Sequence, residues 1–179
     1  MRSVVIVSGC PGSGKTTLCR ALAAEEPKGL HLVSDTFYEF IAHPKDMTSA
    51  ESHHQNTVVM EALASSIQAF ARGGYCVFLD GVVGPWFLPV FRPYFESRVS
   101  VHYIVLHVPE GEALERVRGR QSHGLSPVVT QMHRSLADLG GLAKHGIDVA
   151  GLTEADALEA VRSAIASGSL ELDWSLVGP

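Results

Sequence analysis

The sequence lacks the features that would place the protein in a membrane, on nucleic acid or in a disulfide framework. It has three cysteines in 179 residues, a formal net charge of −5, and no run near the ~18 apolar residues needed to span a bilayer. An odd count of cysteines without metal-like spacing favours reduced packing residues in the cytoplasm. The acidic balance argues against broad capture of a nucleic-acid backbone. Met1-Arg2-Ser3 leads directly into an apolar run, so we expect no cleaved signal segment.

Apolar runs alternate with helix-like stretches along the chain, without repeats or low-complexity segments. Strands are predicted at residues 3–8, 30–34, 75–80 and 99–108, with a weak fifth strand near 146–150. Because these runs are almost continuously apolar, both faces of the sheet should be covered by helices. The alternation predicts an α/β fold with a parallel sheet, in a single domain over residues 1–179.

Helices are predicted at residues 16–24, 49–72, 111–119 and 127–139, and after Thr153. Thr48 and Glu51 have the spacing of a capping box for the longest helix, and Thr153 and Asp156 have it for the last. The longest helix has an apolar stripe at steps of three and four, which should be buried: Val59, Leu63, Ile67 and Phe70. The tail at 169–179 carries apolar residues that dock either on the body or on a partner.

The most specific motif follows the first predicted strand and reads Gly9-Cys10-Pro11-Gly12-Ser13-Gly14-Lys15-Thr16. It matches the phosphate-binding loop, G-x-x-x-x-G-K followed by Ser or Thr, at every fixed position. In this context backbone N–H groups form a nest for an anion at a helix N-terminus. Lys15 would reach the terminal phosphates and Thr16 would ligate Mg²⁺, with Thr17 next in the helix. We therefore expect a nucleoside triphosphate site; the alternative is a chance glycine-rich turn, which the complete pattern disfavours.

The order of elements, the early phosphate loop and a later arginine-rich segment resemble the adenylate-kinase-like group of P-loop kinases. This group includes nucleotide kinases, gluconate kinase, shikimate kinase and chloramphenicol phosphotransferase, with zeta toxins as distant relatives. The resemblance covers nearly the whole chain, although only the phosphate loop is a sharp motif. It implies a three-layer fold with a five-stranded parallel sheet, helices on both faces and a short arginine-bearing lid near residues 117–130. It also implies an enzyme that uses ATP and Mg²⁺.

Two acidic residues end predicted strands, where parallel sheets collect their binding sites. In shikimate kinase and chloramphenicol phosphotransferase an acid at the place of Asp35 accepts the proton of the attacking hydroxyl, so the resemblance makes Asp35 the candidate base. A helix N-cap is the alternative for Asp35. Asp80 resembles the acid that supports Mg²⁺ in P-loop proteins, although four apolar residues and an acid are a common pattern.

Arg116 and Arg120 are four residues apart and share one face of a continuing helix. In adenylate kinase two arginines with this spacing begin the lid, one against the adenine and one on the phosphates. The alternative is a solvated basic face paired with Glu112 and Glu115. By the same resemblance, the turn at Gly151 would touch the adenine through its backbone.

The remaining reactive side chains give weaker signals. Cys10 lies inside the phosphate loop, where an oxidation-sensitive thiol is the alternative to a packing role. The nine histidines show no ligand spacing and are interpreted as structural or surface residues, with a place in the substrate pocket as the alternative. Aromatic residues at 37–40 and the segment 81–87 either form an acceptor wall or belong to the core.

Together these features predict an ATP-dependent phosphotransferase that moves the γ-phosphate to a hydroxyl of a small molecule. The acceptor would be a sugar acid, a hydroxylated metabolite or an antibiotic, with no nucleic-acid or membrane partner. One alternative is a nucleoside, nucleotide or zeta-like sugar-nucleotide kinase. Another, of a different class, is a non-catalytic nucleotide-dependent switch.

Overall fold

A five-stranded sheet forms the centre of the fold in the computed structural model, which describes residues 3–46, 49–95, 99–119 and 126–178. The strands are β1 (Ser3–Gly9), β2 (Gly29–Val33), β3 (Cys76–Asp80), β4 (Ser100–His107) and β5 (Gly146–Asp148). They lie in the order β2-β3-β1-β4-β5, and every neighbouring pair is parallel. All five predicted strands are present, so the predicted parallel α/β sheet is confirmed.

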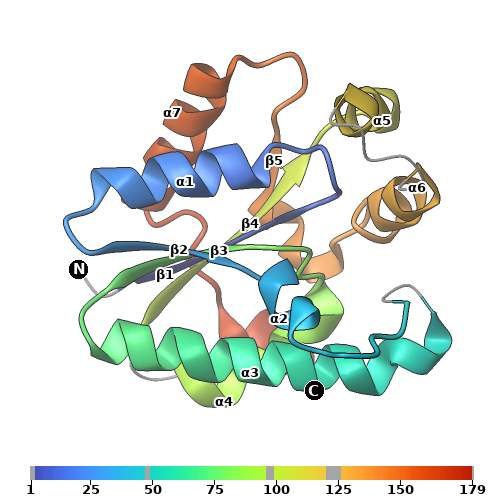
Figure 1. Ribbon diagram of the computed structural model, residues 1–179. Coiled ribbons are helices and arrows are strands. Elements are labelled where there is room, and N and C mark those ends of the chain that lie inside the picture. The colour runs from blue at the N-terminus through green and yellow to red at the C-terminus, as the bar shows by residue number, and fades with distance from the viewer. Residues whose placement is uncertain (1–2, 47–48, 96–98, 120–125, 179) are drawn as a thin grey trace.

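Helices cover both faces of the sheet (Figure 1). One face carries α1 (Lys15–Glu25) and α7 (Glu154–Ala166), and the other carries α3 (His53–Arg72) and α4 (Leu88–Phe95). Successive residues of a strand point to opposite faces. Val4 and Ile6 of β1 accordingly belong to the core below α3, whereas Val5 and Val7 belong to the core below α1. This double burial explains why the strands are continuously apolar in the sequence.

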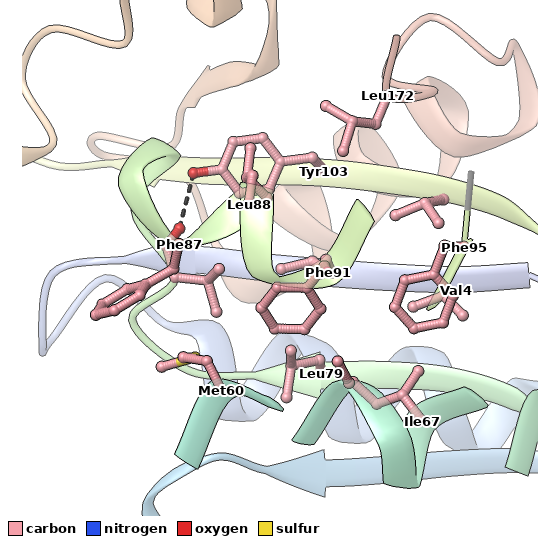
Figure 2. Close-up of a cluster of buried hydrophobic side chains, with 14 of the residues drawn as sticks. Val4, Met60, Ile67, Leu79, Phe87, Leu88, Phe91, Phe95, Tyr103 and Leu172 are labelled. Carbon is pink, nitrogen blue, oxygen red and sulfur yellow. Dashed lines mark hydrogen bonds between the residues drawn. The ribbon is translucent and has the colours of Figure 1, made fainter. Parts of the chain in front are cut away.

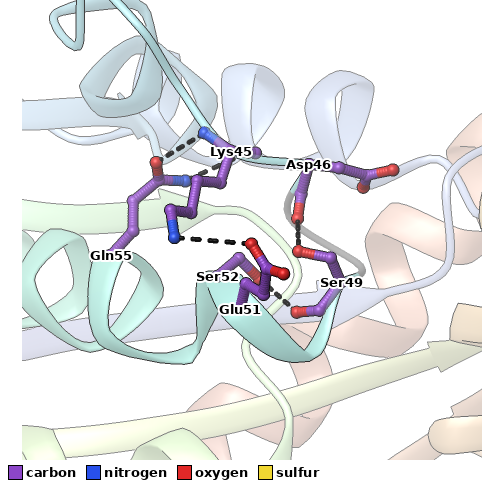
Figure 3. A network of polar contacts seen from close by, with 6 residues as sticks. All are labelled: Lys45, Asp46, Ser49, Glu51, Ser52 and Gln55. Carbon is purple, nitrogen blue, oxygen red and sulfur yellow. Dashed lines mark hydrogen bonds and ion pairs between the residues drawn. The ribbon is translucent and has the colours of Figure 1, made fainter.

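The longest helix begins about one turn later than predicted. A short 3₁₀ helix, η1 (Ala50–Ser52), precedes α3. The Gln55 side chain accepts from Lys45 N at 2.8 Å and donates to Lys45 O at 3.2 Å, which fixes the approaching segment (Figure 3). Glu51 pairs with the Lys45 ammonium at 3.6 Å. Thr48, the other member of the predicted capping box, lies outside the described residues.

The buried stripe of α3 is confirmed except at its end. Val59, Leu63 and Ile67 are at most 4% exposed. Phe70 is 39% exposed, and its ring contacts Tyr75 edge-on with centroids 5.8 Å apart. The prediction for Phe70 was therefore wrong: the last turn of the helix buries Ala71, which is 0% exposed, and turns Phe70 towards the surface.

The sequence did not predict α4 or the 3₁₀ helix before it, η2 (Pro85–Phe87). Pro93 lies inside α4, and proline is a poor signal for a helix interior. The helix is nevertheless amphipathic: Leu88, Phe91 and Phe95 are at most 1% exposed and point into the core shown in Figure 2. Packing of these side chains outweighs the loss of backbone hydrogen bonding at the proline.

The C-terminal tail docks on the body of the protein, which answers the question that the sequence left open. Leu172 N–H donates to the carbonyl of Val101 on β4 at 2.7 Å. The Arg92 guanidinium of α4 donates to the carbonyl oxygens of Trp174 and Val177, the latter at 2.5 Å. Trp174 begins a last 3₁₀ helix, η4 (Trp174–Leu176).

Three helices lie near the carboxyl ends of the strands: α2 (Asp35–Glu39), α5 (Glu110–Gly119) and α6 (Ser126–Ser135) (Figure 1). The predicted lid at residues 117–130 overlaps the end of α5 and the start of α6, and its residues 120–125 lie outside the described part of the chain. A 3₁₀ helix, η3 (Gly140–His145), connects α6 to β5. Among the helices described, none has the length and apolar character to cross a membrane.

The predicted start of the last helix is confirmed. Thr153 Oγ1 accepts a hydrogen bond from Asp156 N at 3.2 Å, as a capping residue does. This cap places the N-terminus of α7 beside the turn that follows β5, close to the phosphate loop between β1 and α1.

Candidate active site

Residues 9–14 form a tight turn between β1 and α1 at the carboxyl edge of the sheet. Gly9, Gly12 and Gly14 have φ values of 145°, 87° and 96°, a region that favours glycine. Gly12 is also constrained by packing, because a Cβ there would lie 2.5 Å from the carbonyl oxygen of Ala113 on α5. Helix α1 begins at Lys15, so its unpaired N–H groups face this turn and suit an anion.

The Lys15 ammonium lies against the loop itself. Its Nζ donates to the carbonyl oxygens of Gly9 at 2.9 Å and Cys10 at 3.0 Å. Burial lowers the pKa of Lys15, and the negative charge of Asp80 counteracts this shift. Ser13 Oγ is buried and has no hydrogen-bond partner within the described structure. A partly buried cation on neutral carbonyls and an unsatisfied buried hydroxyl in one loop both fit a polyphosphate ligand.

Asp80 is held beside this loop by the sheet. It ends β3, directly opposite Val7 of β1, and its side chain is 4% exposed. Its Oδ2 lies 3.1 Å from Nε2 of His31 on β2. Sequence reasoning missed His31, because it treated the histidines as structural or surface residues. One signal could have found it. The residue is polar but lies within an apolar strand, and the neighbouring strand ends in an acidic residue.

Asp35 lies at the end of the next strand, β2, and is exposed to solvent. It is the first residue of α2, and Ser34 takes the N-cap position, so the capping interpretation of Asp35 was wrong. Ser34 Oγ donates to Asp35 Oδ1 at 3.2 Å. The loops after β2 and β3 touch each other here, since a Cβ at Gly81 would lie 2.2 Å from Ser34 Oγ. The charge of Asp35 also acts on the pKa of Lys15, which places the carboxylate within electrostatic range of the loop.

A cavity of about 440 Å³ opens on the other side of the phosphate loop, between α1 and α7. Its volume is in the range of small-molecule sites. Its walls include Thr17, Leu18, Ala21, Arg116, Val149 and Leu152. Gly151, with φ of 65°, turns the chain between the last two of these. The cavity is mainly apolar next to the glycine loop, an arrangement that suits a base attached to a phosphate chain.

Arg116 connects this cavity to the phosphate loop. Its Nη1 donates to the carbonyl oxygen of Gly12 at 3.3 Å, and its Nη2 pairs with Glu112. The structure therefore contains the ion pair with Glu112, which the alternative interpretation expected, and also a contact of Arg116 with the phosphate loop. Arg120, the second predicted arginine, lies outside the described residues.

The cysteines behave as packing residues. Cys10, Cys19 and Cys76 are free and buried, and burial raises the pKa of each thiol. Thiols in such surroundings are poor nucleophiles, which argues against an oxidation-sensitive role for Cys10. Within the ranges that the structure describes, no three His, Cys, Asp or Glu side chains gather as a metal site.

The aromatic residues proposed as an acceptor wall divide into two groups. Phe87 is 9% exposed and packs in the core near Met60 (Figure 2). Phe40 and Trp86 are 73% and 47% exposed, respectively. Phe37 lies between these extremes, partly buried and in ring contact with Phe40.

Comparison with known proteins gives structural neighbours of the expected kind. A sugar kinase from Janibacter sp. HTCC2649 has a TM-score of 0.71 and 21% identity, covering 96% of this chain and 99% of that one. A gluconokinase from Sinorhizobium meliloti 1021 has a TM-score of 0.70 and 15% identity, covering 94% of each chain. Shikimate kinase from Acinetobacter baumannii has a TM-score of 0.62 and 20% identity, covering 94% and 96%. At these identities the likeness establishes the fold, and it confirms the predicted resemblance to small-metabolite P-loop kinases.

No curated protein sequence matches the chain significantly. The sequence profile of the AAA domain matches residues 5–125. This stretch contains the phosphate loop, Asp35, Asp80 and Arg116. The chain therefore belongs to the AAA domain family of P-loop proteins.

Proposed function

We propose that the protein transfers the γ-phosphate of ATP to a hydroxyl group of a small molecule. The observation that carries this proposal is the meeting of three groups at one edge of the sheet. Lys15 is partly buried in the phosphate loop, Asp80 is buried beside it, and Asp35 is exposed at the end of the adjoining strand. A site that only binds a nucleotide needs Lys15 and Asp80 but does not need Asp35.

The chain's own groups provide most of what phosphoryl transfer requires, which is positioning and charge stabilisation. The backbone N–H groups of residues 12–16 would hold the phosphates, and Lys15 would move from the loop carbonyls to the terminal phosphate oxygens. The cavity between α1 and α7 would hold the base, with Arg116 in its wall. Arg120 is proposed to add a second guanidinium as the transferring group develops charge.

The residues present fit a magnesium ion. Thr16 follows Lys15 in the first turn of α1, and the Asp80 carboxylate is close enough to act on the pKa of Lys15. Both supply the hard oxygen atoms that Mg²⁺ prefers, with Asp80 acting through water. When bound, the ion would neutralise charge on the β- and γ-phosphates.

Asp35 is the proposed base because it is exposed where an acceptor would approach the phosphates. The oxygen of the acceptor hydroxyl would form a bond to the γ-phosphorus, and its proton would pass to Asp35. The bond from that phosphorus to the β,γ-bridging oxygen would break, and its electron pair would leave with ADP. An ordinary carboxylate suffices, since orientation rather than strong basicity is needed.

The test is ADP release in the presence of a panel of sugars, hydroxy acids, antibiotics and nucleosides. We expect one class to stimulate release, Lys15→Ala to abolish it, and Asp35→Asn to reduce it at least ~100-fold while ATP binding is kept. Lys28→Ala is the matched control, because Lys28 is an exposed cation over the Tyr75 ring, away from the loop. Slow hydrolysis that no acceptor stimulates would indicate a nucleotide switch instead.

A further inference from the structure

Two exposed aromatic side chains lie on the segments that leave the sheet next to Asp35. Phe40 follows α2, the helix that begins with Asp35, and Trp86 lies in η2, after β3. They are 73% and 47% exposed. A single exposed aromatic residue is ordinary, but large apolar groups beside a candidate active site are typical of ligand contact. The two segments are neighbours because their first residues, Ser34 and Gly81, are in contact.

Apolar side chains that pack against the core lie on the same two segments, and one of them contacts Phe40. Phe37 contacts Phe40 with ring centroids 5.6 Å apart, and Phe37, Tyr38, Ile41 and Val82 all pack against the core. Burial, with the charge of Asp35 as the second cause, raises the pKa of the Tyr38 phenol to about 12. Tyr38 therefore stays uncharged, and its hydroxyl lies within electrostatic range of the proposed base.

The two segments that carry Phe40 and Trp86 have little positive charge that could bind an anionic acceptor. Residues 34–61 contain five acidic residues and one basic residue, Lys45. The Lys45 ammonium is paired with Glu51 at 3.6 Å (Figure 3). Arg92 is the basic residue of the segment 81–95, and its guanidinium is bound to the tail carbonyls of Trp174 and Val177. In the described parts of these two segments, both basic side chains are thus engaged elsewhere.

We propose that the acceptor is an uncharged hydroxyl compound with an aromatic or other apolar group. The apolar group packs against Phe40 and Trp86 while the hydroxyl reaches Asp35. This inference rests on the proposed function and narrows it, because it disfavours sugar acids and phosphorylated acceptors. The bonds made and broken are those of the proposed transfer of the γ-phosphate to the acceptor hydroxyl.

Matched acceptors test separately how the charge of the acceptor and its aromatic ring affect the rate of transfer. 1-Phenylethane-1,2-diol and mandelate share a phenyl ring and a secondary hydroxyl, and differ in a CH₂OH group against a carboxylate. Sorbitol and gluconate form the corresponding pair without a ring. We expect the phenyl diol to give a kcat/KM at least ~10-fold above that of mandelate and of sorbitol. A preference for mandelate or gluconate overturns this inference but leaves the kinase proposal intact, whereas no stimulation by any acceptor overturns both.

Variants test the two aromatic residues directly. Phe40→Ser and Trp86→Ser should each raise KM for the phenyl diol about 10-fold and leave KM for ATP and the melting temperature unchanged. Phe70→Ser is the matched control, because Phe70 is also exposed but lies at the far end of α3. An unchanged KM for the diol in both variants contradicts the proposal.

Binding can also be followed without turnover. The chain has two tryptophans, Trp86 and Trp174, so Trp174→Phe leaves Trp86 as the sole indole. The phenyl diol should change the fluorescence of this variant at concentrations where mandelate does not. An equal or larger response to mandelate contradicts the proposal.

Discussion

The Nε2 atom of His31 lies 3.1 Å from the Oδ2 atom of Asp80. The two residues come from neighbouring strands, and their side chains are 18% and 4% exposed. Asp80 also acts electrostatically on Lys15, so this carboxylate lies between a histidine and the phosphate loop. A hydrogen bond to one oxygen of a carboxylate fixes the direction of the other, which is how residues behind a metal ligand improve metal binding.

His31 should therefore set the magnesium requirement of the proposed phosphotransferase. We expect His31→Phe to raise the Mg²⁺ concentration for half-maximal ADP release by about 10–100-fold, because the carboxylate loses its orienting partner. His31→Gln keeps a side-chain donor and should restore most of the effect. If His31→Phe folds with an unchanged melting temperature and an unchanged Mg²⁺ dependence, the positioning role is wrong.

Gly12 should tolerate no side chain. Gly12→Ala places a Cβ 2.5 Å from the carbonyl of Ala113 at a φ of 87°, and we expect it to destabilise the protein by about 1–3 kcal/mol and to weaken ATP binding. Gly111→Ala is the control, because Gly111 lies in α5 with open space around its Cα position. Urea unfolding and calorimetry with Mg-ATP measure the two effects. Equal behaviour of the two variants contradicts the packing argument.

Arg92 should stabilise the fold without taking part in the reaction. Arg92→Met leaves the tail carbonyls without their donor, and we expect a loss of about 1–3 kcal/mol in the free energy of unfolding. Arg72→Met is the control, since Arg72 is exposed at the end of α3. The specific activity of the folded Arg92 variant should stay near that of the wild type. A large loss of activity with unchanged stability would instead place Arg92 at the acceptor.

Stability should fall as the pH is lowered from 7.5 to 5.5. Burial lowers the pKa of His102, His107 and His145 in the folded state. Above the unfolded value of about 6.5 the histidines are neutral in both states, and below it the unfolded chain binds more protons, which favours unfolding. Asparagine at position 145 can keep the donor that His145 Nδ1 gives to the carbonyl of Tyr103 at 2.9 Å.

His145→Asn should accordingly show a shallower dependence of the unfolding free energy on pH over this range. The measurement is a series of urea titrations at fixed ionic strength. A wild-type stability that stays constant or rises towards pH 5.5 contradicts the account of the buried histidines.

The sequence was sufficient for the features that local patterns determine. Continuous apolar runs identified the strands, the glycine-lysine motif located the phosphate loop, and the spacing of Thr153 and Asp156 identified a helix start. The features it missed depend on tertiary contacts. The helix α4 contains a proline and forms because Phe91 and Phe95 reach the core. The sequence of one strand also does not reveal which side chain of the neighbouring strand lies next to it.

The candidate site was predictable to a similar extent. The positions of Lys15, Asp35 and Asp80 followed from the rule that parallel strands bring their carboxyl ends to one edge. The pairing of His31 with Asp80 depends on the register of β2 against β3, and the engagement of Arg92 depends on where the tail docks. Neither is encoded in a short stretch of sequence.

The most direct test of the proposed function is ³¹P NMR of ATP, Mg²⁺ and an uncharged aromatic diol with the purified protein. The account predicts a new phosphomonoester resonance that grows in step with ADP and is absent with Lys15→Ala. Growth of inorganic phosphate alone, or no change in the ATP resonances with any hydroxyl compound, would contradict it.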